Sequence, residues 1–191
     1  MQRLWIILLW SVCLGSISPA LGIEDYSSTF KAFKASPVVA PFFKSAYGYA
    51  AFPTIGKGGV GIGGAHGNGQ VYRANEVTGT ASMTQLTIGL QFGGQAYSQM
   101  IFFQDKRAYD NFTSGNFEFG AQASAVAITA SAQAQAGTAA AGAGASTGRD
   151  AGKQHAGYRN GMVVFTYAKG GLMYEASLGG QKFSFEPIGK K

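Results

Sequence analysis

Hydrophobic and polar residues alternate through most of the chain beyond residue 70, and this period of two predicts β-strands. Glycine pairs and short polar stretches interrupt the alternation, as is typical of turns between strands. One such pair, Gly93-Gly94, predicts a break or bulge between two strands. The strands predicted in this part of the chain cover residues 86–92, 96–103, 117–136, 162–167, 172–178 and 182–185.

The alternation changes phase within residues 117–136. Phe117 and Phe119 begin a run of aromatic and small side chains that continues over six odd positions. From Thr129 onward the odd positions are polar instead. Because a change of phase by one residue swaps the two faces of a strand, we expect a bulge or strand break near Ile128 and Thr129.

Residues 48–72 contain glycine at a density that is too costly in chain entropy for a helix interior. Val60, Ile62 and Val71, with small residues between them, suit a tightly packed strand. The Asn-Gly pair within residues 66–69 favours a two-residue hairpin turn. This stretch therefore predicts strand, tight turn and strand, with glycines where another backbone or a ligand comes close.

Residues 57–61 of the same stretch superficially resemble a phosphate-binding loop. Such a loop requires Gly-Lys-Ser/Thr at the start of a helix, so that the lysine and hydroxyl meet phosphate and metal. Here Gly61 is followed by Ile62 and two further glycines, which do not open a helix. Nucleotide binding is therefore not expected.

Residues 24–47 form the predicted helical part of the chain. The first helix places three aromatic residues, spaced i, i+4 and i+7, on one face with two lysines beside them: Tyr26, Phe30, Phe33, Lys31 and Lys34. This face either covers the sheet, as most amphipathic helices do, or lies on a membrane with its lysines on head groups.

A second helix is expected to begin at Ser36-Pro37, because serine is a good N-cap and proline suits the first helical position. It would end near Ala46 and point Lys44 to solvent. A third, short helix is expected after the N-cap residue Asp105. It would run to Phe112 and end before Gly115.

Residues 1–22 have the pattern of a cleaved secretory signal peptide: a short basic start, an apolar stretch and small residues near Gly22. A membrane anchor and lipidation at Cys13 are the alternatives. The apolar stretch is short for a membrane span, and no small residue directly precedes the cysteine. We expect an exported protein that is periplasmic, membrane-associated or secreted, with a mature chain that lacks cysteine.

Residues 137–155 are rich in alanine, glycine and serine, and predict a flexible loop. Within them, residues 144–148 match the Gly-x-Ser-x-Gly pattern of a hydrolase nucleophile, and Asp150 and His155 follow in the order of a catalytic triad. A nucleophile elbow needs a buried strand before it and a helix after it. Because these residues all lie in one polar loop, esterase activity is not expected.

Composition limits the kinds of ligand and reaction that the chain can support. The chain carries 15 basic and 9 acidic side chains, so loss of Arg3 with a signal peptide would leave 14 against 9, a net charge of +5. This modest excess favours anionic surfaces and also serves simple solubility. Two histidines, His66 and His155, cannot form a three-histidine zinc site, and the carboxylates are scattered. We therefore expect no metal, no cofactor, no catalysis and no nucleic-acid partner.

Three segments resemble the signature of the SYLF domain family, also called the Ysc84 family. They are residues 49–64 (YAAFPTIGKGGVGIGG), 86–103 (LTIGLQFGGQAYSQMIFF) and 164–180 (VFTYAKGGLMYEASLGG). The resemblance extends over about residues 37–185 and keeps the motifs in order. It implies a domain without catalytic activity that binds lipids. In related proteins phosphoinositide binding involves an N-terminal amphipathic segment, and eukaryotic relatives are associated with actin.

These observations predict an α+β fold in which a Gly-rich antiparallel β-barrel or sandwich packs against N-terminal helices and one short helix. Residues 23–191 would form a single domain. The hypothesis for function is an exported domain that associates with anionic phospholipid through basic residues and an aromatic amphipathic helix. Its predicted lipid-binding residues are Tyr26, Phe30, Lys31, Phe33, Lys34, Lys44 and Lys57.

Three alternatives remain open at this point. The chain could be a structural envelope protein that acts through protein–protein contact or as a homo-oligomer. It could be a small outer-membrane barrel, although it has few outward apolar bands of the required length. It could be an enzyme, although no catalytic constellation is evident.

Overall fold

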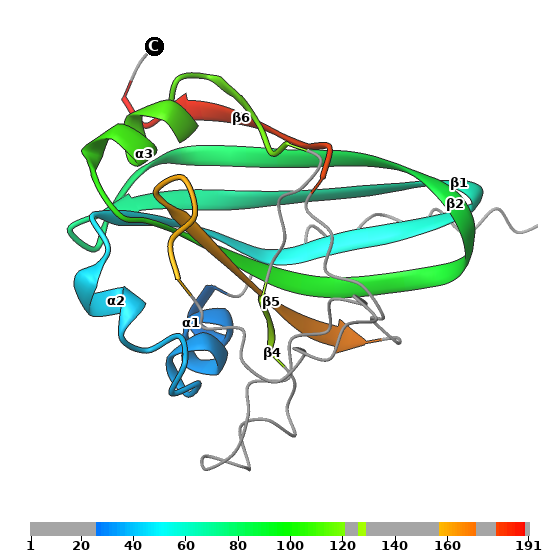
Figure 1. Cartoon of the computed structure of the whole chain (residues 1–191), viewed down its shortest axis with the longest axis horizontal. Helices are drawn as coiled ribbons and strands as arrows, with labels where there is room; N and C mark the ends of the chain where they lie inside the picture. The colour runs from blue at the N-terminus through cyan, green and yellow to red at the C-terminus, as the bar shows by residue number, and fades with distance from the viewer. Residues whose placement is uncertain (1–25, 121–125, 129–156, 171–178, 190–191) are drawn as a thin grey trace, which may run out of the picture.

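The computed structural model describes residues 26–120, 126–128, 157–170 and 179–189 (Figure 1). Side chains are described at all of these positions except 60–62, 87–93, 126–128 and 170. Several predictions fall outside this part of the chain: the signal peptide, the flexible loop with its Gly-x-Ser-x-Gly match, and the strand at residues 172–178. No helix within the described ranges is long and apolar enough to cross a membrane.

One sheet of six strands organises the described chain (Figure 1). Its path runs β3-β6-β2-β5-β4, and β1 pairs with β2. All pairs are antiparallel except β4 with β5. The strands are β1 Gly48–Arg73, β2 Glu76–Phe103, β3 Asn116–Glu118, β4 Val126–Ile128, β5 Met162–Gly170 and β6 Gln181–Pro187.

The long hairpin of β1 and β2 turns at Ala74 and Asn75, whose φ angles of 51° and 64° are those of a two-residue hairpin loop. The turn predicted at residues 66–69 is therefore wrong. Asn68 stays extended and pairs with Ser82 in the middle of the hairpin. Continuous cross-strand pairing along both strands outweighs the local preference of one Asn-Gly pair, because each paired residue adds to the stability of the sheet.

The two halves of β2 have different neighbours. Residues 79–85 pair with β6, whereas residues 96–103 pair with β5. Between them both strands of the hairpin bend (Figure 1), and the register shifts between Val60 and Ile62 of β1. The predicted break at Gly93-Gly94 is absent, since both glycines pair in register and β2 runs through them.

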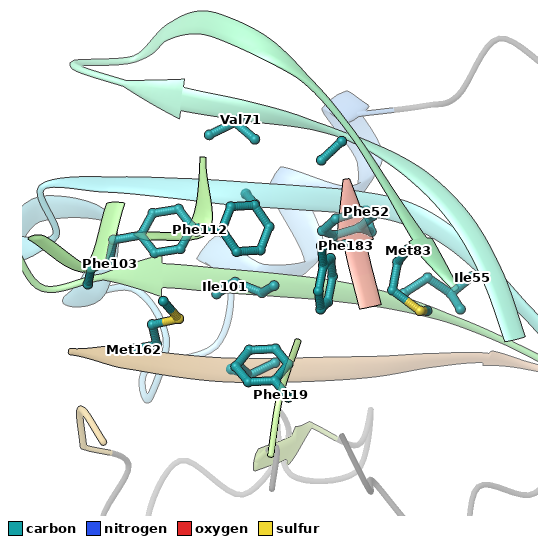
Figure 2. Close-up of a cluster of buried hydrophobic side chains, with 14 of the residues drawn as sticks. Phe52, Ile55, Val71, Met83, Ile101, Phe103, Phe112, Phe119, Met162 and Phe183 are labelled. Carbon is teal, nitrogen blue, oxygen red and sulfur yellow. The ribbon is translucent and has the colours of Figure 1, made fainter. Parts of the chain in front are cut away.

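The bend brings the two halves of the sheet face to face, as in a sandwich. Side chains from both halves and from one helix fill the space between them (Figure 2). Phe52 of β1 contacts Phe183 of β6, with ring centroids 5.5 Å apart. Because the described path ends at β3 on one side and at β4 on the other, the fold is an α+β sandwich and not a closed barrel.

Glycines let the two halves of β1 approach each other closely. A Cβ atom on Gly69 would lie 2.5 Å from the carbonyl oxygen of Ala51. One on Gly67 would lie 2.7 Å from the carbonyl oxygen of Thr54. Real Cβ atoms are not found so close to backbone oxygens, so the prediction that glycines mark a close backbone approach is confirmed.

Residues 117–136, for which strand structure with a bulge or break near Ile128 and Thr129 was predicted, serve both edges of the sheet. The start of this segment belongs to β3, which pairs with β6, and residues 126–128 form β4 against β5. The described residues thus form two short strands in opposite halves of the sheet, and residues 129–136 lie outside the described part of the chain. Alternation alone could not reveal this, because it indicates which face a residue occupies and not which strand it pairs with. The predicted strands at residues 162–167 and 182–185 are confirmed within β5 and β6.

In the described part of the chain, three helices accompany the sheet: α1 Tyr26–Lys34, α2 Phe42–Ser45 and α3 Lys106–Phe112. Helix α2 begins after Pro41, so the predicted start at Pro37 is wrong and only turns precede it. Proline donates no backbone hydrogen bond and disfavours the helical conformation of the residue before it. Pro41 therefore splits the segment that was predicted to be one helix.

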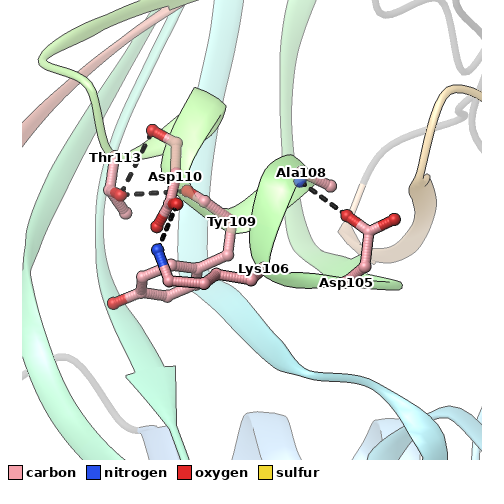
Figure 3. A network of polar contacts seen from close by, with 6 residues as sticks. All are labelled: Asp105, Lys106, Ala108, Tyr109, Asp110 and Thr113. Atoms are coloured by element: carbon pink, nitrogen blue, oxygen red, sulfur yellow. Dashed lines mark hydrogen bonds and ion pairs between the residues drawn. The ribbon is translucent and has the colours of Figure 1, made fainter.

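Helix α3 is confirmed with its cap. The Asp105 carboxylate accepts a hydrogen bond of 2.8 Å from the backbone N–H of Ala108 (Figure 3). Lys106 and Asp110 form an exposed ion pair one turn apart. Gly115 follows with a φ of +117°. The helix buries Ala108, Tyr109 and Phe112 against the inner core.

Replacing Asp105 with alanine should destabilise the protein by about 1 kcal/mol, because the first turn of α3 loses the acceptor for an otherwise unpaired N–H group. Urea unfolding measures the change. Asp110→Ala is the matched control, since it removes an exposed i,i+4 ion pair worth about 0.5 kcal/mol or less. Equal losses in the two variants would contradict a capping role.

Candidate functional site

Helices α1 and α2 pack on the outer face of the sheet half that contains the start of β1, the end of β2 and β5. Successive residues of these strands point to opposite faces. One set faces the inner core, and the other forms a second hydrophobic cluster beneath the two helices. The buried members of this second cluster are Phe33, Val39, Tyr49, Ala51, Tyr72, Met100, Phe102, Val163 and Phe165.

The aromatic residues predicted for lipid contact occupy different depths in this layer. Phe33 has no exposed surface and packs edge-on to Tyr167 of β5, with ring centroids 6.3 Å apart. Tyr26 and Phe30 are half-buried against the same cluster. The aromatic face of α1 therefore covers the sheet, and in this structure Phe33 is not available to a membrane.

Phe30 lies on a pair of stacked tyrosines. The rings of Tyr49 and Tyr72 are 4.9 Å apart and nearly parallel, and Phe30 meets both edge-on at 5.9 Å and 5.4 Å. Burial, with the nearby Tyr49 phenol as the smaller cause, raises the pKa of Tyr72 to about 12. Burial also raises the pKa of Tyr49. Both phenols are therefore neutral near pH 7, and the support for α1 carries no negative charge.

Lys34 lies over two of the aromatic rings at the edge of this layer. Its Nζ atom is 5.8 Å from the ring centroid of Phe30 and 5.2 Å from that of Phe43. These distances permit cation–π attraction of about 0.5–1 kcal/mol each at an exposed site. Lys31 and Lys44 are exposed on the same two helices. Three lysines thus share this surface with half-buried Phe30 and Phe43.

Acidic residues are absent from this part of the sequence. The chain contains no Asp or Glu between residues 26 and 75. Among the described residues, the ion pairs join Lys106 to Asp110, Arg107 to Asp105 and Lys182 to Glu118, all elsewhere. The lysines of α1 and α2 have no described carboxylate partner, so their charges are available to an anionic ligand or surface.

Arg159 was missed by the sequence reasoning. Its neighbour Tyr158 packs edge-on to Phe42 of α2 at 5.4 Å, so the backbone of exposed Arg159 lies close to α2. We define the α1–α2 surface by its cations and half-buried aromatic residues, namely Lys31, Lys34, Lys44, Arg159, Phe30 and Phe43. No local sequence signal could have added Arg159, because more than 100 residues separate it from Lys44.

Lys57 does not belong to this surface. It is half-buried on β1, where it pairs with Gln95 close to the bend of the hairpin. Eight residues separate it from Tyr49, roughly 25 Å along an extended strand. The structure therefore divides the predicted lipid-binding residues into a group on α1 and α2 and one distant lysine.

No group of three potential metal ligands occurs within the described ranges. His66 is exposed on β1, with its Nδ1 atom 3.4 Å from the hydroxyl of Thr84. The arrangement on the α1–α2 surface can attract anions and offer apolar ring edges. These are the means by which peripheral proteins hold anionic lipid surfaces.

Comparisons with known proteins agree with the motifs. The family model described as Ysc84, Las17-binding protein actin regulator, matches residues 84–187. This match includes the second and third of the three motifs found in the sequence. Beta cell expansion factor A of Aeromonas veronii is 26% identical over 161 residues, which cover 82% of this chain and 52% of that protein. The chain thus spans about half the length of this curated relative.

Proposed function

Because the chain belongs to the Ysc84 (SYLF) family, matched as Las17-binding protein actin regulator, we propose that it is a non-enzymatic domain that binds anionic phospholipid surfaces. The α1–α2 surface makes the contact. The protein acts after export, at a membrane accessible from the periplasm or the cell exterior. These proposals extend beyond family membership and rest on the features of this surface.

Charge segregation is the observation that carries the proposal. Lys31, Lys34, Lys44 and Arg159 lie on one layer of the molecule without described carboxylates, whereas the described ion pairs lie on other elements. A basic side chain close to an anionic membrane contributes about 1 kcal/mol to binding. Four such residues together provide an attraction that falls off within about a Debye length.

The aromatic residues have two separate roles in this mechanism. Phe33 anchors α1 to the sheet and so holds the lysines in place. Phe30 and Phe43 are half-buried, and the Lys34 ammonium group lies over both rings. On approach to a membrane, Lys34 can move to a phosphate and leave these rings to the interface, where aromatic side chains are favoured. Apolar contact is therefore shallow, and electrostatic attraction dominates.

Reversing Lys31, Lys34 and Lys44 together to glutamate should abolish binding to anionic vesicles. Removal of three contributions of about 1 kcal/mol each lowers the partition coefficient at least about a hundredfold. Co-sedimentation with vesicles of neutral and of anionic lipid, at low and high salt, measures the effect. The parent protein should bind only anionic vesicles, and less at high salt.

Lys57, Lys169 and Lys182 provide the matched control. Their reversal to glutamate changes the net charge by the same amount but leaves the α1–α2 surface intact. This control should keep most of the binding, apart from the nonspecific part that depends on net charge. Equal loss in both variants would show that the α1–α2 surface has no special role. A parent protein that binds no vesicle would overturn the lipid proposal and favour protein–protein contact.

A further inference from the structure

Four polar side chains are buried together inside the sandwich. Gln85, Gln99 and Gln181 are 3%, 0% and 1% exposed, and Tyr97 is 5% exposed. They come from both halves of β2 and from β6. Every one faces the inner side of the sheet, where the neighbouring positions are filled by residues such as Met83 and Ile101. Burying amides at such positions is costly unless their hydrogen bonds are made.

The four side chains bond mainly to one another, with Gln181 at the centre. Gln99 donates to the side-chain oxygen of Gln181 at 3.1 Å, and Gln85 donates to the backbone carbonyl of Gly179 at 2.9 Å. The Gln181 amide group donates toward Gln85, Tyr97 and Gln99 at 3.3–3.4 Å. Two N–H groups are thus shared among three acceptors at long distances, so the network is only partly satisfied.

Thr166 of β5 extends this cluster. It pairs with Gln99 across the ladder, so both side chains are on the same face of the sheet. Thr166 is only 2% exposed, and its hydroxyl has no hydrogen-bond partner in the described part of the chain. The second N–H of Gln99 and the hydroxyl proton of Tyr97 likewise have no described acceptor. Three donors without a described acceptor therefore lie on the inner face of the paired strands β2 and β5.

Burial raises the pKa of Tyr97, against a smaller opposing effect of the hydrogen bond from Gln181. The phenol therefore keeps its proton at neutral pH and can donate it. The cluster contains no charged side chain, so an ionised ligand would remain without a counter-charge in a buried site, at a large cost in free energy. A neutral oxygen atom can accept from these donors, and a hydroxyl oxygen can also donate to an amide oxygen.

We propose that Tyr97, Gln99 and Thr166 form a binding site for one neutral hydroxyl oxygen, supplied by a water molecule or by a small polyol. The bound oxygen accepts two hydrogen bonds, from the Gln99 amide and the Tyr97 hydroxyl, and donates its own proton to the hydroxyl oxygen of Thr166. It thereby completes the network centred on Gln181. A buried water commonly makes about three hydrogen bonds to groups that would otherwise be unsatisfied. The inference is independent of the α1–α2 surface and of lipid binding.

Thr166→Val and Thr166→Ser test the proposal as a pair. Valine has the shape of threonine but no hydroxyl, whereas serine keeps the hydroxyl. If Thr166 holds a bound oxygen, valine should lower Tm by about 3 °C and serine should lower it less. In the parent protein and the serine variant, the side-chain amide of Gln99 should show an NMR cross-relaxation signal to long-lived water. The valine variant should lose that signal.

Titration with glycerol then separates the two sources of the oxygen. Saturable shifts of the Gln99 and Gln181 side-chain amide signals would identify a polyol hydroxyl as the ligand, and a water signal without such shifts would identify water. The absence of both signals in the parent protein would overturn the proposal. A Thr166→Val protein at least as stable as the parent would also overturn it, because an unpartnered buried hydroxyl is better replaced by a methyl group.

Discussion

Replacing Gly69 with alanine should destabilise the protein by at least about 3 kcal/mol, and replacing it with valine should prevent folding. The added Cβ would lie 2.5 Å from the carbonyl oxygen of Ala51 and 2.6 Å from the ring of Phe52. The oxygen belongs to the backbone of β1 and Phe52 is fully buried, so neither can move aside cheaply. The two halves of β1 would have to separate and open the inner core.

Gly56→Ala is the matched control for this prediction. Gly56 lies in the same strand, is exposed, and has no atom within 4 Å of a Cβ added to it. Alanine at this position should leave the stability unchanged or raise it by about 0.5 kcal/mol, because it restricts the unfolded chain. Urea unfolding of both variants measures the change in the free energy of unfolding that each substitution causes. Comparable stabilities would show that β1 does not fold back on itself as described.

Replacing Phe33 with alanine should destabilise the protein by about 4 kcal/mol, because it removes a fully buried ring and leaves a cavity under α1. The same change at half-buried Phe30 should cost about 1–2 kcal/mol. Thermal or urea unfolding measures both losses. An unchanged stability in Phe33→Ala would mean that α1 does not use this ring to hold the sheet.

A second substitution at Phe33 distinguishes a role in anchoring α1 to the sheet from a role in membrane contact. Phe33→Leu keeps an apolar side chain in the cluster and should fold with a smaller loss of stability. Because the residue does not reach the surface, this variant should bind anionic vesicles as the parent does. A folded Phe33→Leu protein with weakened binding would show that Phe33 leaves the core and enters the membrane, and the sequence-based assignment of its role would then stand.

The α1–α2 surface depends on the sheet beneath it. The two helices are short, at 9 and 4 residues, and isolated helices of this length are not stable in water. Their conformation rests on Phe33, Val39 and the aromatic residues of β1 and β2. Any loss of core packing should therefore weaken the proposed membrane contact indirectly, which is why folding must be measured alongside vesicle binding.

Several features of the protein follow from the sequence by itself. The strands predicted at residues 162–167 and 182–185 lie within β5 and β6. Buried and exposed residues alternate at the start of β6, whereas both faces of β5 are covered, so Met162 to Thr166 are all buried. Asp105 and Gly115 marked the ends of α3, because capping uses the chain's own neighbouring atoms. The glycine density in β1 indicated close backbone contact. The motifs also indicated the family that the comparisons establish.

The tertiary structure decided the features that depend on residues distant in sequence. The hairpin turn lies at Ala74 and Asn75 and not at residues 66–69, because pairing along two long strands stabilises the sheet by more than one Asn-Gly pair stabilises a turn. The tertiary structure buried Phe33, for which the pattern alone left both the sheet and a membrane open as contacts. It also brought the backbone of Arg159 close to α2 and gathered Thr166 with buried glutamines. Local preferences are worth about 1 kcal/mol each, whereas burial and pairing act between segments that only the folded chain brings together.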